Sequence, residues 1–289
     1  MSVSQTDRGH HRTALPAAWG QAGVLLGLLA FVFGPTWAWA VGIWRESEYY
    51  GHGFLIIPVS GYLAWRLARR RPMPGGSNWP GLLLTGFGLF LHFAGRLLDV
   101  WFPSGFGFVV ALGGLVWWLW GAKTARHFWF PIVYLAFAVP LERILVLQLA
   151  QPLQLGSTAA AAVVLKSAGL PIEHEGTTLR VPDYTFEVGV PCSGLKTAIA
   201  MTALSALVGY LMTGVWWARL GIFFAGVPLA LVANALRIVV VLVLASTVSP
   251  AVAEGFFHTA SGLLVFALGV GGMLLVARFL GCRAIRSDI

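Results

Sequence analysis

Residues 220–246, LGIFFAGVPLALVANALRIVVVLVLAS, indicate the class of fold that this chain adopts. The stretch contains one charged side chain, Arg237, among residues that are almost all apolar. About 20 consecutive apolar residues in an α-helix are enough to cross the hydrocarbon core of a bilayer. The stretch therefore predicts a helix that spans a membrane.

Seven further segments of the chain have a similar apolar character. Together with residues 220–246 they predict an all-α polytopic membrane protein with about eight transmembrane helices. We expect one integral-membrane domain over residues 1–289, with its helical bundle in 19–280. The other seven spans are expected at 19–43, 53–67, 80–98, 104–122, 128–149, 195–214 and 258–280.

The composition supports a membrane protein. Of the 289 residues, 58% are hydrophobic and 10% are charged, and the mean hydropathy is +0.79. A soluble domain carries about 25% charged residues, so a soluble enzyme, a disordered factor and a collagen-like chain are excluded. The formal net charge is +8, but the 19 Lys and Arg residues are scattered between apolar runs. We therefore expect the chain to associate with the lipid bilayer and not with nucleic acid.

The distribution of positive charge predicts the orientation, because cytoplasmic loops are enriched in Lys and Arg. With the N-terminus in the cytoplasm, 12 of the 19 basic residues and two of the 11 acidic residues lie on the inner side. The opposite orientation would place the basic run Arg69–Arg71 outside. Both termini are therefore expected in the cytoplasm. Cys192 and Cys282 then lie on opposite sides of the bilayer, so we expect no disulfide between them.

One sizeable extracytoplasmic segment, residues 150–194, is expected before the sixth span. Within it, residues 177–181 and 184–188 read as two short β-rich stretches, separated by the turn signal Pro182-Asp183. A small hairpin of this kind could be a lid or substrate platform, or an ordinary loop. Residues 146–169 are expected to be helical and to lie on the surface or against the bundle, because polar side chains interrupt them. These are Gln148, Gln151, Gln154 and Lys166.

Cys192 is a candidate nucleophile, in the sequence Pro191-Cys192-Ser193-Gly194-Leu195 at the outer entrance of the sixth span. If that helix begins near Ser193, the thiol lies at the positive end of the helix dipole, and Lys196 follows one turn later. Both influences would lower the pKa of the thiol, as an attacking thiolate requires. The alternative is that Cys192 is a small apolar filler at a helix cap.

Arg237 is a candidate for charge stabilisation. Counted from Gly221, it lies about 24 Å along its helix, which places it in the outer third of a hydrocarbon core about 30 Å thick. An arginine at this depth is costly unless it faces a polar interior, so it is a functional candidate. Asn234, one turn before it, extends the polar stripe on the same face. The alternative is an arginine that reaches the outer headgroups.

His258, at the start of the eighth span, is a candidate for proton transfer, although a lone interfacial histidine is often just an anchor. Cysteine, arginine and histidine at one level of the membrane suit acyl transfer. His52, in the first outer loop, is a further candidate. His174 lies between two glutamates without a second cluster, so we expect neither a metal site nor a cofactor.

Three motifs, P-C-S-G-L at Cys192, N-x-x-R-I at Arg237 and F-H-x-x-x-G at His258, together resemble the exosortase/archaeosortase family. The stretches WRESEYYGHG at 44–53 and FWFPIVYLAFAVPL at 128–141 resemble that family as well. The resemblance covers most of the chain from about residue 40 to 270. It rests on the three motifs occurring in this order and on one side of the membrane.

The resemblance implies an integral-membrane cysteine peptidase or transpeptidase of the bacterial inner membrane, with its active site on the periplasmic side. Its partners would be exported proteins that end in a sorting signal: a Pro-Glu-Pro type motif, a transmembrane helix and a basic tail. Cys192 would form a thioester with the substrate. Arg237 would stabilise the oxyanion or hold the substrate carbonyl, and His258 would transfer protons.

Two other functions stay open at the level of sequence. One is a membrane component or transporter for exopolysaccharide export without peptidase activity, for which inverted repeats would be expected. The other is an intramembrane protease that hydrolyses the same type of substrate. Hydrolysis and transpeptidation pass through the same acyl-enzyme, so the acceptor that resolves it is left open.

Overall fold

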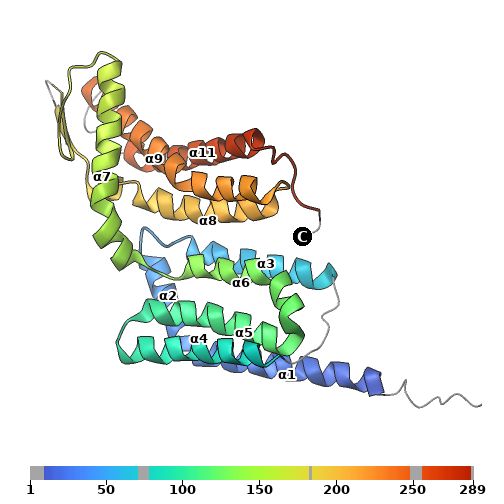
Figure 1. Ribbon diagram of the computed structural model, residues 1–289. Helices are drawn as coiled ribbons and strands as arrows, with labels where there is room; N and C mark the ends of the chain where they lie inside the picture. Colours follow the sequence, from blue (N-terminus) through green and yellow to red (C-terminus); the bar gives the residue numbers. More distant parts are fainter. Residues whose placement is uncertain (1–9, 71–77, 182–183, 248–255, 288–289) are drawn as a thin grey trace, which may run out of the picture. The chain divides into compact units, whose positions relative to one another are not determined.

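A computed structural model of the chain describes residues 10–70, 78–181, 184–247 and 256–287. The described part is almost entirely helical and contains one small sheet (Figure 1). It divides into two compact units. Met1–Arg45 and Gly53–Pro140 form the first unit, and Glu46–His52 and Leu141–Ile289 form the second.

The first unit consists of helices that are joined by short connections. Its core is completed by buried polar contacts: the Ser104 hydroxyl lies 2.5 Å from Thr36 Oγ1 and 2.7 Å from His92 Nδ1. The Trp44 indole N–H donates to the carbonyl of Ala138 at 2.9 Å. The elements are α1 (His10–Val32), α2 (Gly34–Glu46), α3 (Gly53–Arg70), α4 (Trp79–Leu97), α5 (Trp101–His127), α6 (Trp129–Tyr134) and η1 (Leu135–Ala138).

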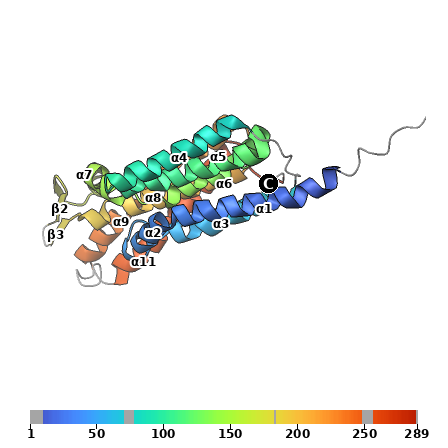
Figure 2. The same cartoon turned by 90° about the horizontal axis from the view of Figure 1, so that it is seen from below.

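The second unit combines three packed helices with a small three-stranded sheet. α8 (Leu195–Leu211), α9 (Trp216–Thr247) and α11 (Phe256–Phe279) lie side by side, around a core that includes Met201, Ile222 and Met273 (Figures 1 and 2). The remaining elements are α7 (Glu142–Ser167), β1 (Glu173–Glu175), β2 (Thr178–Val181), β3 (Tyr184–Glu187) and η2 (Val190–Cys192).

Within this unit α7 has a different direction from the three packed helices. Figure 1 shows it running across the N-terminal end of α8, and Figure 2 shows it nearly end-on beside α8. The sheet has the order β1-β2-β3, with both pairs antiparallel. α7, β2 and the C-terminal half of α9 share a small apolar core that includes Leu165, Leu179, Ile238 and Leu242, and Cys192 packs against it.

The structure supports a polytopic helical protein but does not confirm eight spans. Three described helices are long and apolar enough to cross a membrane: Trp101–His127, Trp216–Ser246 and Gly262–Phe279. The number rises to five if each of two bent helix pairs is one span. The predicted span 19–43 is one such pair, because the chain bends by 59° between α1 and α2. Pro35 lies in the first turn of α2, where proline is tolerated but cannot continue a preceding helix.

The predicted span 128–149 is also interrupted. The helix ends with η1 at Ala138, Pro140 follows, and α7 begins at Glu142. The predicted helix at 146–169 is confirmed as part of α7, and the two predicted strands are confirmed as β2 and β3. Their turn, Pro182-Asp183, lies outside the described residues. β1 could not be predicted from the sequence, because Glu-His-Glu has no β-forming side chain.

Candidate functional site

Cys192 is held by a short helical turn that precedes α8. Its N–H donates to the carbonyl of Gly189 at 2.9 Å, and the N–H of Ser193 donates to that of Val190 at 3.1 Å. α8 begins at Leu195, the predicted first residue of the sixth span, and Gly194 is its N-cap with φ of +81°. Cys192 therefore lies three residues before the helix. The thiol is half-buried, and both cysteines are free, as expected.

Asn234 of α9 fixes the backbone at Cys192. Its Nδ2 donates to the carbonyl oxygen of Cys192 at 2.8 Å, and the side chain is 1% exposed. Its Oδ1 is buried and has no hydrogen-bond partner among the described residues. A buried acceptor without a partner is costly, and in native proteins such an atom calls for an explanation. Asn234 therefore supports the Cys192 turn and keeps one buried acceptor without a partner among the described residues.

Gly194 allows this close approach between the turn and α9. A Cβ at Gly194 would lie 2.9 Å from Cγ and 3.0 Å from Nδ2 of Asn234. The φ of +81° is also one that residues with a side chain rarely adopt. Two independent constraints thus require glycine directly after the Cys192-Ser193 pair.

Arg237, one turn after Asn234 on α9, acts electrostatically on Cys192. Burial raises the pKa of the Cys192 thiol above its ordinary value, and the nearby positive charge of Arg237 opposes this by favouring the thiolate. The structure therefore brings the predicted thiol and guanidinium together. The predicted lowering of the pKa is wrong, because desolvation by the surrounding apolar core is the larger effect.

Lys196 does not act on the thiol in the predicted way. Its side chain is exposed at the start of α8, and the causes that act on the Cys192 pKa are burial and Arg237. Lys196 follows Cys192 by four residues, a spacing that places two side chains one turn apart when both are in a helix. Cys192 precedes α8, so this spacing does not bring Lys196 to the thiol.

The two candidate histidines of the site are His258 and His52. The backbone of His258 is in the first turn of α11, but its side chain lies outside the described residues. His52 is half-buried and stacks on Tyr50, with ring centroids 5.4 Å apart. The loop Glu46–His52 belongs to the second unit, which also contains Cys192 and Arg237. His174 is exposed in β1, and its Nε2 lies 3.0 Å from the carbonyl oxygen of Gly176.

α7 supports the segment that leads to Cys192. Gln154 Nε2 donates to the carbonyl oxygen of Val188, a residue with no exposed surface. The N–H of Val188 donates to Thr177 at 2.9 Å and so ties the same residue to the sheet. Val188 is thus held on both sides, four residues before Cys192. Gln154 is one of the polar side chains that interrupt the predicted helix at 146–169, and this polar position was the signal for the contact.

A cavity of about 380 Å³ lies between α7 and α9. Its walls include Gly156, Ser157 and Ala160 from α7, and Ala235 and Leu236 from α9. Ser157 is 2% exposed, and its hydroxyl has no hydrogen-bond partner among the described residues. Ala235 and Leu236 lie between Asn234 and Arg237 in the chain. An apolar cavity therefore borders the stretch of α9 that contacts Cys192.

These features together suit nucleophilic chemistry at a carbonyl group. A thiol is half-exposed on a fixed turn, a guanidinium is close enough to influence it, and the buried amide oxygen of Asn234 has no partner among the described residues. No group of three or more His, Cys, Asp or Glu side chains that could hold a metal occurs in the described residues.

Comparison with known proteins gives one clear result. The family model described as transmembrane exosortase matches residues 44–275. This match includes Cys192, Asn234, Arg237 and His258. No curated protein and no solved structure matches the chain significantly.

Proposed function

Because the chain belongs to the transmembrane exosortase family, we propose that it is a cysteine-dependent membrane peptidase or transpeptidase acting on sorting signals. Its substrates are exported proteins with a C-terminal Pro-Glu-Pro type motif, a transmembrane helix and a basic tail. The observation that carries the proposal is the contact of α9 with the Cys192 turn. Asn234 binds the backbone of Cys192, and Arg237 acts on its thiol.

In this proposal Cys192 Sγ attacks the carbonyl carbon of the scissile peptide bond. The C–N bond breaks, the thiol proton passes by way of a general base to the leaving amine, and a thioester remains. An acceptor nucleophile then attacks the thioester and regenerates the thiol. With water as the acceptor the reaction is hydrolysis, and with an amine or hydroxyl it is transpeptidation or transesterification. Arg237 stabilises the negative charge that develops on the carbonyl oxygen.

The raised pKa of Cys192 makes a general base necessary. A thiol whose proton is retained at neutral pH must lose it during the attack, and a neighbouring imidazole is suited to accept it. His258 is the proposed base, and His52 is a supporting candidate in the same unit. The buried Oδ1 of Asn234 is proposed to accept an N–H from the substrate backbone and so to orient it.

The cavity between α7 and α9 supports an apolar substrate that arrives within the membrane. Its lining is almost entirely apolar. Two of the lining residues, Ala235 and Leu236, lie between Asn234 and Arg237 in the chain. We propose that the chain lies in the inner membrane of a bacterium, with both termini in the cytoplasm and Cys192 on the periplasmic side. This orientation follows from the distribution of basic residues.

The test is co-expression with an epitope-tagged exported protein that carries the complete sorting signal. The wild-type chain is expected to convert the tagged protein to a shorter form, and Cys192→Ala to leave it at full length. Cys282→Ala, a matched control on a buried cysteine, is expected to retain processing. Continued processing by Cys192→Ala would refute the assignment of the nucleophile.

A further inference from the structure

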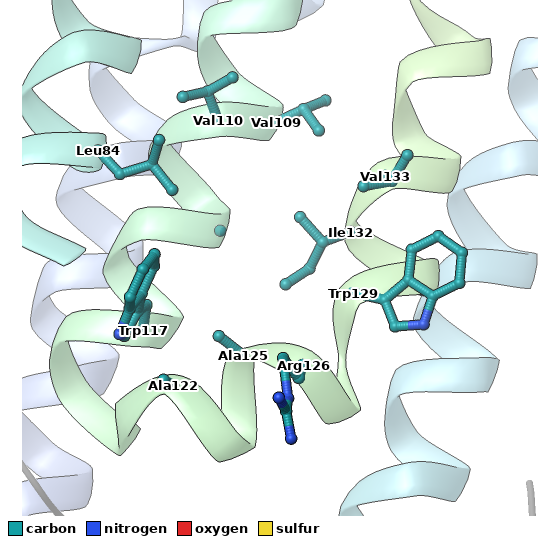
Figure 3. Close-up of a pocket in the computed structure, with 11 residues that line it drawn as sticks. Leu84, Val109, Val110, Trp117, Ala122, Ala125, Arg126, Trp129, Ile132 and Val133 are labelled. Atoms are coloured by element: carbon teal, nitrogen blue, oxygen red, sulfur yellow. The ribbon is translucent and has the colours of Figure 1, made fainter. Parts of the chain in front are cut away.

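The first unit contains a cavity that the proposed peptidase reaction does not use. It has a volume of about 410 Å³ and is bounded by α4, α5 and α6 (Figure 3). Its far wall is apolar, with Leu84, Val109 and Val110. Arg126 is the one charged side chain among the described residues that line it. The cavity therefore has an apolar part and one charged end.

A break in α5 shapes the charged end. Gly121 has φ of 83° and ψ of 167°, values outside the helical region that a residue with a side chain rarely adopts. The last turns of α5 consequently change direction, and Ala122, Ala125 and Arg126 lie at one end of the cavity in Figure 3. The Arg126 side chain is exposed at this end, which we call the mouth of the cavity. Its guanidinium points away from the apolar wall, so it can bind a group at the mouth.

The charged end of the cavity favours an acceptor. Arg126 carries N–H donors and no acceptor, so a group that binds it accepts hydrogen bonds. Its positive charge favours an anionic acceptor. Trp117 also lines the cavity, and its buried indole Nε1 has no hydrogen-bond partner in the described part of the chain.

The surroundings of this end are strongly basic. His127 Nε2 lies 3.4 Å from the carbonyl oxygen of Leu67, which places the end of α3 at the same end of the unit. The basic residues gathered there are Arg66, Arg69, Arg70, Lys123 and Arg126. Asp99 is the single acidic residue in the sequence from Gly53 to Pro140, and it follows α4 at that helix's other end. The electrostatic potential therefore favours an anion at the mouth of the cavity.

We propose that this cavity binds an anionic glycerophospholipid. One acyl chain fills the apolar part, and the headgroup phosphate binds Arg126, with Lys123 nearby. An apolar cavity that opens to a bilayer is filled more favourably by hydrocarbon than by water. Basic pockets between transmembrane helices are suited to anionic headgroups, and a guanidinium can bind phosphate through two parallel N–H groups. The site is independent of Cys192 and of the peptidase reaction.

The test is native mass spectrometry of the full chain in a mild detergent. The protein is titrated with phosphatidylglycerol or with phosphatidylethanolamine that has the same acyl chains. The wild-type chain is expected to bind phosphatidylglycerol more tightly. Arg126→Gln is expected to weaken this binding about fivefold, the effect of one charge near a lipid surface. It should weaken the binding of phosphatidylethanolamine less, because the ammonium group of that lipid offsets the charge of its phosphate. Arg126→Lys should keep the preference, and so should Arg278→Gln, which removes an exposed charge from α11 in the second unit.

A second pair of variants tests the acyl chain. Gly113 lines the cavity, and a Cβ there would meet Ile132 at an ordinary 3.6 Å, so Gly113→Leu fills the cavity without a backbone clash. Gly113→Leu is expected to weaken the binding of both lipids. Gly86→Leu adds the same side chain at a position where no atom lies within 4 Å of the added Cβ, and it should leave the binding of both lipids unchanged. Soluble glycerol phosphate is expected not to compete.

Three outcomes would overturn the proposal. Equal binding of the two lipids by the wild-type chain, with no effect of Arg126→Gln, would refute the anionic preference. Unchanged binding in Gly113→Leu would show that the acyl chain lies elsewhere. Competition by glycerol phosphate at similar concentration would show that a free phosphate compound is the ligand. Each variant's elution and thermal unfolding are compared with the wild type, so that a folding defect is recognised separately.

Discussion

At the scale of single residues, the environment of Cys192 combines two opposed effects. Its thiol lies against an apolar core, which penalises the thiolate, and beside Arg237, which favours it. Burial is the larger effect, so the resting site holds a protonated thiol. Such a nucleophile reacts slowly with arbitrary electrophiles and becomes reactive when a bound substrate and a base remove the proton.

The first prediction concerns this balance of charges. In a Cys282→Ala background, the rate of Cys192 alkylation is expected to rise with pH and to reach its midpoint above that of an ordinary cysteine. Arg237→Gln should move the midpoint to still higher pH, because it removes the positive charge that favours the thiolate. Lys196→Gln is the control and should leave the midpoint unchanged. A larger shift in Lys196→Gln than in Arg237→Gln would contradict the electrostatic assignment.

The second prediction concerns Gly194. Gly194→Ala is expected to reduce processing of a tagged substrate about tenfold or more, because a small displacement of a catalytic group is costly. The added Cβ would displace either Asn234 or the Cys192 turn. Gly169→Ala is a matched control, since Gly169 has the same φ of +81° and no atom within 4 Å of its Cβ position. Similar losses of activity in both variants would show that the backbone conformation alone is responsible.

The sequence could identify Cys192, Asn234 and Arg237 because each is a polar exception in an apolar context. It could not predict the pKa direction at Cys192. That direction depends on residues far apart in the chain, Leu179 in β2 and Ile238 in α9, that form the apolar core around the thiol. The role of Gly194 was missed for a similar reason, since the neighbour that excludes a side chain is 40 positions away, at Asn234.

At the scale of elements, α7 has a structural role that differs from that of a spanning helix. It runs across the end of α8 (Figure 1), and the side chain of Gln154 supports the segment before Cys192. α9 has the complementary role, because one helix supplies Asn234, Arg237 and one wall of the adjacent cavity. The site therefore depends on the contact between these two helices.

The third prediction tests the support by α7. Gln154→Leu is expected to lower the free energy of unfolding by about 1–3 kcal/mol, because the carbonyl of the buried Val188 loses its donor. Gln151→Leu makes the same exchange at an exposed position of α7 and should change stability by about 0.5 kcal/mol or less. Denaturant unfolding of both variants in detergent measures the difference. Equal stability would mean that the contact contributes nothing.

The positions of most elements could be predicted, because apolar length and turn residues are local properties. The exceptions have two kinds of cause, proline residues within an apolar stretch and contacts between elements. Pro35 and Pro140 divide two stretches that appear continuous in composition, and β1 forms only because β2 provides a neighbouring strand. The direction of α7 follows from its packing on α9 and the sheet, which no local pattern contains.

At the scale of the whole molecule, the sequence predicts an orientation that the helices alone do not test. The fourth prediction therefore uses exposed positions, because Cys282 is only 1% exposed and would resist labelling on either side. In a Cys192→Ala, Cys282→Ala background, Thr185→Cys in β3 should react with a membrane-impermeant thiol reagent on intact spheroplasts. Arg283→Cys should react only after permeabilisation. The opposite pattern would reverse the predicted topology.

The central claim is that Cys192 forms a thioester with a sorting signal. The most direct measurement is the capture of a covalent complex between the chain and a tagged substrate, followed by treatment with neutral hydroxylamine, which cleaves thioesters. We predict a hydroxylamine-sensitive complex in the wild-type chain and in Cys282→Ala, with the bond mapped to Cys192 by mass spectrometry. A complex that persists in Cys192→Ala, or one linked through another residue, would contradict the claim.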